Sequence, residues 1–183
     1  SKKYAEITDG AFDVTVQPLW NIYSEAFTKT NKPPTEDEIE KTLSLVDWRS
    51  ISVNKNLINY EINGMSSTLN GIAQGYITDK ISENLINSGI NNTLVQLGEY
   101  RGIGDHPDGR PWRLLLSNPE HTDTIGEIEF TNAALATSAG LGTPFDLSGK
   151  YHHIFDPKSG YSSNNYLQVS VLAKTAAEAD ALA

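Results

Sequence analysis

Residues 70–88, NGIAQGYITDKISENLINS, begin with closely spaced small residues and continue as a helical pattern. Ile77, Ile81 and Leu85 recur every four residues, as on the apolar side of a helix, and Gly89 stands where a left-handed C-terminal cap belongs. The free N–H groups and the positive dipole end of such a helix start suit a pyrophosphate. The alternative interpretation is a small-residue helix packed tightly against a sheet.

Apolar segments on both sides of this helix predict a sheet. Strand-like stretches occupy residues 51–62, 93–97, 110–116, 126–130, 133–138, 152–155 and 166–173. The run His106–Gly109, HPDG, predicts a turn that gives residues 110–116 an antiparallel partner.

Capping signals predict two further helices. Thr35 and Glu38 fit a capping box, and so do Thr175 and Glu178. Helices mixed with mainly antiparallel strands are typical of the α+β class. We therefore predict a mixed, mainly antiparallel sheet with packed helices, in a single domain over residues 1–183.

Composition narrows the classes of function. Apolar residues make up 38% of the 183 residues and charged residues 20%, which is enough for a sizeable core. The formal net charge of −9 argues against nucleic acid or an anionic membrane surface as the main partner, and it suits a bound cation. The absence of Cys excludes disulfides and thiolate metal sites.

The ends of the sequence carry two expectations. No apolar run reaches the roughly 18–20 residues that a membrane span needs, and no signal peptide precedes the first patterned segment. The chain enters that segment at once and stops inside an expected helix. We therefore expect truncation at both ends.

Residues 151–160, YHHIFDPKSG, combine imidazole and carboxylate groups. Side chains alternate along a strand, so His152 and His153 are expected to point in opposite directions, with only one of them reaching a given site. Asp156 stands at a turn and could orient an imidazole that acts as a general base. The alternative is a surface histidine pair before an ordinary Asp-Pro turn.

Two further patterns have local chemical meaning. Asp180 lies among small helix-forming residues, which leave its carboxylate free to bind a hard cation, although a single Asp on a helix is commonly just solvated. Thr137 and Ser138 end a strand with hydroxyl groups, which suits either a ligand or a strand leaving the core.

Six segments in order resemble the ApbE-like FAD:protein FMN transferases. They are GAFDVTVQPLW, TLNGIAQGYITDK, LVQLGEYRGIGDHPDGRPWR, ALATSAGLGTPFD, HHIFDPKSG and VSVLAKTAAEADALA, and together they cover nearly the whole chain. Gly98-Glu99 replaces the Gly-Gly of many members. With LNGIAQGYITD and HPDGRPW, it is similar to the branch that accompanies nitrous oxide reductase. That branch flavinylates a membrane-attached electron-transfer flavoprotein in the bacterial periplasm.

The resemblance implies an ApbE-like fold and a phosphoryl-transfer reaction. FAD is split at its pyrophosphate, FMN is joined by a phosphoester bond to a Thr or Ser of a target flavoprotein, and AMP leaves. Mg²⁺ neutralises the developing charge. The alternatives are an FAD pyrophosphatase that releases FMN and AMP, and a non-catalytic flavin-binding maturation factor.

The resemblance also implies roles for individual residues. The carboxylate of Asp180 and the backbone carbonyl of Ala73 are expected to bind the metal. His153 is expected to be the base for the target hydroxyl, and Asp156 to support it or the loop beside the flavin. The expected cofactor contacts are Ala11, Phe12, Asp13, Asn70, Gly71, Tyr76, Thr137 and Ser138.

Overall fold

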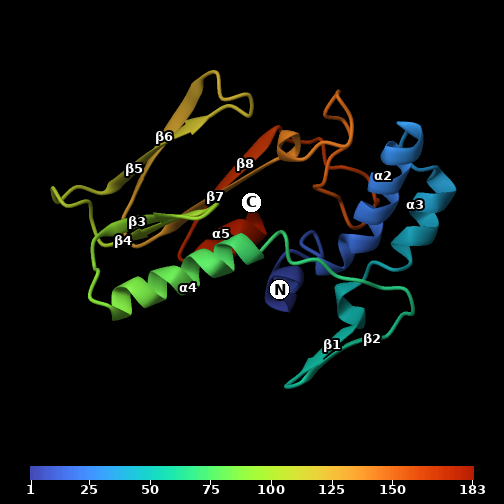
Figure 1. The fold of residues 1–183 in the computed structure, drawn as a ribbon, viewed down its shortest axis with the longest axis horizontal. Coiled ribbons are helices and arrows are strands. Elements are labelled where there is room, and N and C mark those ends of the chain that lie inside the picture. Colours follow the sequence, from blue (N-terminus) through green and yellow to red (C-terminus); the bar gives the residue numbers. More distant parts are fainter. The chain divides into compact units, whose positions relative to one another are not determined.

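A computed structural model describes residues 1–183 and confirms the α+β class, with every strand pair antiparallel. The chain divides into two compact units (Figure 1). The first unit comprises Ser1–Leu69 and Gly140–Tyr166, and the second comprises Asn70–Ala139 and Leu167–Ala183. None of the helices has the length and hydrophobicity needed to cross a bilayer. The expectation of a single domain stays a prediction.

The first unit is mainly helical. Its elements are α1 (Lys2–Ile7), α2 (Gln17–Thr30), α3 (Glu36–Leu43), the hairpin β1 (Ile51–Asn54) and β2 (Leu57–Tyr60), and the short 3₁₀ helices η1 (Val14–Val16), η2 (Trp48–Ser50) and η3 (Gly140–Gly142). The predicted capping box of α3 is confirmed, since Thr35 Oγ1 accepts from the Glu38 N–H group and the Glu38 carboxylate accepts from that of Thr35.

An aromatic cluster forms the core of the first unit. Leu19, Tyr23, Ile39 and Phe155 are buried together, and further rings pack around them. The rings of Tyr23 and Phe155 are 5.0 Å apart between centroids, which is the range of favourable aromatic pairs. Phe155 belongs to the predicted site segment 151–160, so packing of its ring holds that segment against α2.

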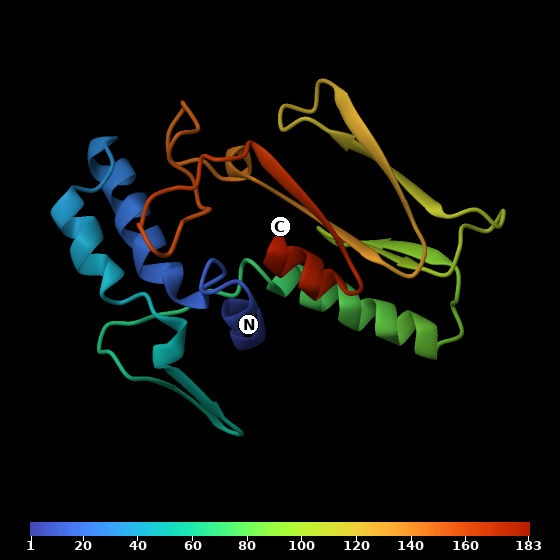
Figure 2. The ribbon, with the colours of Figure 1, turned by 180° about the vertical axis from the view of Figure 1, so that it is seen from behind.

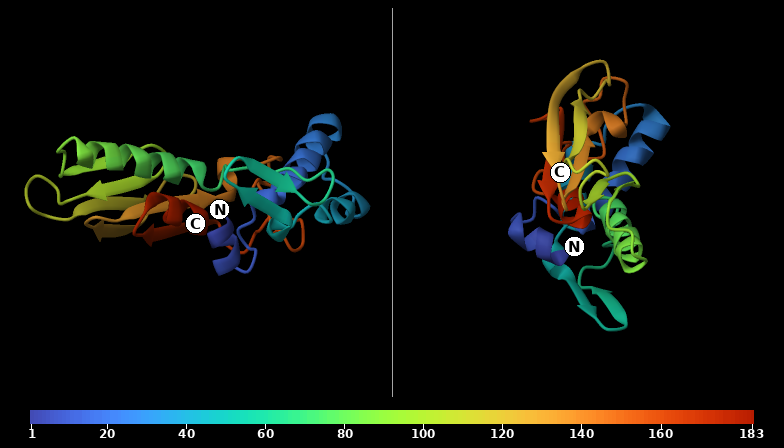
Figure 3. Two further views of the ribbon diagram at one scale, coloured as in Figure 1. Left: turned by 90° about the horizontal axis from the view of Figure 1, so that it is seen from below. Right: turned by 90° about the vertical axis from the view of Figure 1, so that its left-hand side faces the viewer.

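The second unit joins a four-stranded sheet to two helices. The strands are β3 (Thr93–Gln96), β4 (Tyr100–Ile103), β7 (Ala134–Ala139) and β8 (Gln168–Ala173), in the order β3-β4-β7-β8. Strands β5 (Trp112–Ser117) and β6 (Thr124–Phe130) form a separate ribbon, and the helices are α4 (Ala73–Asn87) and α5 (Ala176–Leu182). Figure 2 shows α5 against the N-terminal half of α4, and Figure 3 shows α4 running along the strands.

The prediction that Ile77 and Ile81 lie on the buried face of α4 is wrong. Ile77 and Ile81 are 53% and 40% exposed, whereas the buried residues of the helix are Gly75, Thr78 and Ser82. The physical reason is the closeness of α5, against which only small side chains fit. The predicted left-handed cap is confirmed at Gly89, where φ is +86°.

Two strand predictions need correction. Residues 152–155 form only isolated bridges, Pro144 to His152 and Phe155 to Ser162. Residues 110–116 pair with β6 rather than across the HPDG turn, because β3 already pairs with β4, a strand that the sequence analysis missed. The turn itself is confirmed, with the Gly109 N–H group 2.8 Å from the His106 carbonyl.

Of the two hydrogen bonds of the second predicted capping box, the structure contains the one accepted by the Thr175 side chain. Thr175 Oγ1 accepts from the Glu178 N–H group, as predicted. The first two N–H groups of α5, those of Ala176 and Ala177, donate to the carboxylate of Asp79 on α4. A side chain from another helix thus completes the cap.

Gly160→Ala should destabilise the first unit more than Gly109→Ala does. Both glycines have positive φ, +76° and +86°, which costs an alanine about 1–2 kcal/mol. A Cβ at Gly160 would also lie 2.7 Å from Ile39 Cγ2, whereas one at Gly109 would meet nothing within 4 Å. Overpacking should add about 1–3 kcal/mol at Gly160. Urea unfolding of both variants measures the difference, and equal losses would refute the tight packing.

Candidate functional site

Asp180 is anchored to the first turn of α4. Its Oδ2 atom accepts a hydrogen bond of 2.8 Å from the Gly75 N–H group, one of the groups that a helix start leaves without a partner inside the helix. Asp79, one turn further along α4, accepts from the first two N–H groups of α5 at 2.8 and 2.9 Å. Each of the two helices therefore supplies a carboxylate that accepts hydrogen bonds from the first-turn N–H groups of the other helix.

The approach of the two helices is a backbone contact. A Cβ at Gly75 would lie 2.3 Å from the carbonyl oxygen of Ala176. The surrounding core consists of alanines, namely Ala134, Ala136, Ala176 and Ala179. Tight packing of this small-residue helix is therefore confirmed, but its close partner is helix α5 rather than a sheet. Binding of a pyrophosphate at the helix start stays a prediction.

The other residues predicted around this helix start are distributed as follows. Ala73 is the first residue of α4, and Asn70 and Gly71 lie just before its N-cap residue, Ile72. The side chain of Tyr76 is 56% exposed, and Lys80 Nζ lies 5.6 Å from the centre of its ring. The structure thus brings Ala73 and Asp180 to the same turn of α4.

Thr137 and Ser138 lie on β7, as predicted. Thr137 lies directly opposite Ser170 on the neighbouring strand β8, and the Thr137 Oγ1 atom is 2.8 Å from Ser170 Oγ. The backbone N–H group of Thr137 donates to the carboxylate of Glu99.

Glu99 is a buried acid that the sequence analysis noted only as a departure from the family pattern. Its Oε2 atom is buried without a hydrogen-bond partner, and the residue is 6% exposed. Burial raises the pKa of Glu99 to about 7, the charge of Asp180 adds to the increase, and the Thr137 N–H group opposes it. Burial also raises the pKa of Asp180, against the effect of the Gly75 N–H group.

The donor set at this turn fits a hard cation. It contains no cluster of three or more His, Asp or Glu side chains, so a cation would depend on few carboxylates. Mg²⁺ is commonly held by one or two carboxylates together with waters and substrate phosphates. The orphaned oxygen of Glu99 and the carboxylate of Asp180 match that pattern.

His153 lies in the first unit and has a defined tautomer. Its Nδ1 atom is 3.2 Å from the Thr143 carbonyl, which can only accept, so the proton resides on Nδ1 and the Nε2 lone pair is available. Burial lowers the pKa of His153, and the bond to Thr143 opposes the decrease. The imidazole is therefore neutral near pH 7, as a general base must be. The expectation that His153 and Asp180 face one cleft stays a prediction.

Asp156 does not orient this imidazole. Its carboxylate accepts from the Lys158 N–H group at 2.9 Å and from the Ser159 hydroxyl at 2.8 Å, both in its own turn. Thr143 takes the orienting role instead, because the segment is folded into turns and not into the strand that the prediction assumed. The hydroxyl of Ser159 thus serves to close the turn.

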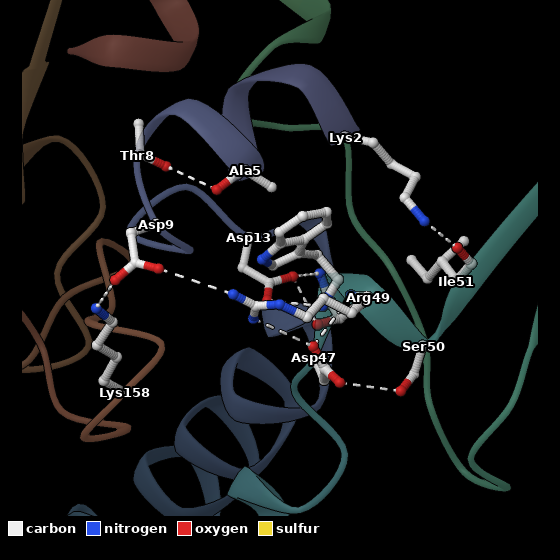
Figure 4. Close-up of polar contacts among 12 residues, drawn as sticks. Lys2, Ala5, Thr8, Asp9, Asp13, Asp47, Arg49, Ser50, Ile51 and Lys158 are labelled. Carbon is white, nitrogen blue, oxygen red and sulfur yellow. Dashed lines mark hydrogen bonds and ion pairs between the residues drawn. The ribbon is translucent and has the colours of Figure 1, made fainter.

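Asp13 is buried and fully engaged within the first unit. Its carboxylate accepts from the N–H and hydroxyl groups of Thr15 at 2.7 and 2.6 Å, and from the Trp48 N–H group at 3.0 Å. Figure 4 shows the surrounding polar cluster, in which Lys158 reaches Asp9. The Lys158 Nζ to Asp9 distance of 2.9 Å ties the turn of Asp156 to the segment that leads into Asp13.

The two neighbours of Asp13 differ in their surroundings. Phe12 packs against the apolar cluster of Val14, Ile51 and Met65, and Ala11 is exposed. Their assignment as cofactor contacts stays a prediction.

Gly75→Ala should destabilise the second unit by about 1–3 kcal/mol, because the added methyl group would collide with the Ala176 backbone. The sign of the change in the free energy of unfolding tests the contact, since a Gly→Ala substitution inside a helix or strand ordinarily stabilises a protein by roughly 0.5–1 kcal/mol. Gly126→Ala on β6 is the control, because its nearest neighbour is a side-chain carbon 3.8 Å away. Urea unfolding should separate the two variants, and a stabilising Gly75→Ala would contradict the close approach.

Acid should destabilise the protein through His152. Burial, and then the charge of His153, lowers the pKa of His152. As the pH falls, His152 is therefore protonated in the unfolded chain before it is protonated in the folded protein. The contribution of neutral His152 to the free energy of unfolding is complete above about pH 6.5 and is lost as the pH falls through the lowered pKa.

His152→Asn should flatten this dependence, since the Asn oxygen can still accept from the Ile154 N–H group that now binds Nδ1 at 3.3 Å. His121→Asn, at an exposed position with φ of +58°, is the control. Urea unfolding at pH 5 and pH 7 gives both slopes, and an unchanged slope in His152→Asn would exclude this residue as the cause.

Known proteins similar to this chain share both its sequence and its fold. The FAD:protein FMN transferase of Vibrio cholerae is 33% identical over 185 residues, covering 97% of this chain and 55% of the relative. That of Haemophilus influenzae is 30% identical over 191 residues, covering 97% and 54%. The chain spans about half the length of these curated relatives.

Solved structures confirm the expected ApbE-like fold. The ApbE protein from Thermotoga maritima superimposes with a TM-score of 0.88 at 32% identity, covering 98% of this chain and 60% of that one. The flavinyl transferase ApbE from Pseudomonas stutzeri, in its apo form, gives a TM-score of 0.81 at 26% identity, covering 99% and 57%. The sequence model of the ApbE family matches residues 1–183. The chain therefore belongs to the ApbE family.

Proposed function

We propose that this chain carries out, as part of an FAD:protein FMN transferase, the transfer of FMN from FAD to a Thr or Ser hydroxyl of a target flavoprotein. The acceptor oxygen forms a bond to the phosphorus of the FMN moiety, the bond to AMP breaks, and AMP leaves. Family membership over the whole chain supports the reaction class. The observation that carries the proposal is Asp180, which the Gly75 N–H group holds at the start of a glycine-rich helix.

The start of α4 is the binding element for the pyrophosphate. Its exposed N–H groups and the positive end of its dipole attract phosphate oxygens. The small residues Gly71 and Ala73, which precede the buried Gly75, crowd this approach little. Tyr76, exposed beside them, supplies a ring for the cofactor.

Asp180 and the Ala73 carbonyl would hold Mg²⁺. The ion supplies positive charge against the phosphate oxygens of the transition state. Because Asp180 is bonded to Gly75, its carboxylate keeps one orientation relative to the helix start, and this preorganisation favours charge stabilisation at a fixed point.

His153 takes the proton from the acceptor hydroxyl. The Thr143 carbonyl holds the imidazole with Nδ1 protonated, so Nε2 is the atom that receives the proton. The lowered pKa keeps the group neutral before reaction. Such a base contributes about 10²–10⁴-fold to a rate.

The partner we propose is a flavoprotein with an acceptor Thr or Ser, of the membrane electron-transfer type, in the bacterial periplasm. The similarity of Gly98-Glu99 and HPDGRPW to the branch that accompanies nitrous oxide reductase supports this assignment. Nucleic acid is not proposed as a partner, given the net charge of −9.

Mass spectrometry of an acceptor peptide tests the reaction. The chain is incubated with FAD, Mg²⁺ and a peptide with a candidate Thr, beside the Vibrio cholerae relative as a reference enzyme. The peptide should gain the mass of FMN less water, with one AMP released per label, and EDTA should abolish both. His153→Asn should slow labelling by roughly 10²–10⁴-fold, and Asp180→Ala should abolish it, whereas exposed His121→Asn should not change it.

The products separate this function from its alternatives. AMP release without peptide labelling would replace the transferase with an FAD pyrophosphatase. FAD binding with neither product would indicate a non-catalytic flavin-binding maturation factor. Full labelling by Asp180→Ala would refute the metal assignment.

A further inference from the structure

Glu99 sits in the tight turn between β3 and β4, next to Gly98, whose φ of +104° only glycine adopts easily. The carboxylate points inward, because the residue is 6% exposed and its Oε2 atom is buried with no hydrogen-bond partner. Folded proteins rarely bury an unpaired carboxylate oxygen, and where they do the group commonly serves a ligand or an ion.

Contacts on both sides place this turn beside the Asp180 site. A Cβ at Gly98 would lie 2.9 Å from the side-chain amide of Gln74, so the turn rests on the first turn of α4. Gln74 directly precedes Gly75, whose N–H group holds Asp180. On the other side, the Thr137 N–H group donates to the carboxylate of Glu99.

No basic side chain compensates the two acids. Arg101, two residues beyond Glu99, has its Nε atom 3.7 Å from Asp79 Oδ1, and Asp79 also receives the N–H groups of α5. Asp180 has the Gly75 N–H group as its bonded partner. The two carboxyl groups are therefore largely buried without a basic partner, and a bound cation would compensate their ionised forms.

We propose that Glu99 is the second carboxylate of the divalent-cation site built on Asp180, and that its Oε2 atom faces the ion. This inference rests on the proposed function, since it concerns the cation of that same site. Oxygen donors from Glu99, Asp180 and the Ala73 carbonyl form a set suited to Mg²⁺ or Mn²⁺. Two ionised carboxylates also balance the double positive charge of a divalent ion, whereas the carboxylate of Asp180 alone balances only half of that charge.

Binding of Mn²⁺ alone to the 183-residue chain tests the inference without a catalytic assay. Isothermal titration calorimetry, with the free ion followed by electron paramagnetic resonance, gives the affinity of the wild type and three variants. Glu99→Gln keeps the shape of the side chain and removes its charge, and Asp180→Asn does the same at the other carboxylate of the proposed site. Glu129→Gln, at an exposed position on β6, is the matched control.

We expect Glu99→Gln and Asp180→Asn each to weaken Mn²⁺ binding at least about tenfold, with Glu129→Gln unchanged. Thermal unfolding with EDTA gives the second readout. A ligand role predicts that metal-free Glu99→Gln is as stable as the wild type or more stable, because the substitution removes a buried repulsion. It also predicts that Mn²⁺ stabilises this variant less than the wild type.

Three results would overturn the inference. Wild-type affinity in Glu99→Gln, together with weakened binding in Asp180→Asn, would show that Asp180 binds the ion without Glu99. A loss of stability in metal-free Glu99→Gln with unchanged affinity would make Glu99 a structural residue. Absence of Mn²⁺ binding by the wild type would refute the site. Peptide labelling is measured separately from Mn²⁺ binding. A failure of the metal-binding inference is therefore distinguishable from a failure of the proposed transferase function.

Discussion

The contact between the backbones of α4 and α5 determines the rest of the second unit. Without a side chain at Gly75, the Ala176 carbonyl can lie against the helix, and the alanines of α5 and β7 fill the narrow space that remains. The approach also lets each helix supply a carboxylate to the N–H groups of the other, from Asp180 to Gly75 and from Asp79 to Ala176 and Ala177. The carboxylate of Asp180, the proposed metal ligand, is thus positioned by helix packing and not by a flexible loop.

The first unit uses a different kind of constraint. Large rings around Tyr23 and Phe155 fix a segment that has almost no regular secondary structure. Hydrogen bonds within the turns then orient His153 through Thr143 and close the Asp156 turn through Ser159. The aromatic packing provides rigidity, and the local hydrogen bonds provide direction, so the imidazole has a defined tautomer despite lying outside any strand.

Local patterns in the sequence predicted the helices well. The capping box at Thr35 and the left-handed cap at Gly89 depend on neighbouring residues alone, and both are present. The buried face of α4 was not predictable in this way, because apolar periodicity favours Ile77 and Ile81 while the actual partner tolerates only Gly75, Thr78 and Ser82. That partner lies about a hundred residues away, so no local signal points to it.

The same reasoning explains what was found at the candidate site. Asp180 and Ala73 were named from the family resemblance, and the structure brings them to one turn, but Asp79 and Glu99 carry no local motif. Their significance comes from burial and from partners in distant segments, namely the N–H groups of α5 and of Thr137. The imidazole-orienting role predicted for Asp156 is wrong, because its carboxylate accepts hydrogen bonds from Lys158 and Ser159 within its own turn.

The order of the two units along the chain has a consequence for biosynthesis. Each unit is assembled from two separate stretches, so the chain passes between them three times, and the bond from Gly75 to Asp180 spans 105 residues. A ribosome releases α4 long before it releases α5. During that interval the glycine-rich helix start has no Asp180 beside it and no alanine surface to cover it, so the proposed cation site is incomplete. Closing so long a loop also slows folding, because the entropy is lost before the contact forms. The proposed binding site is thus complete only after α5 has been synthesised.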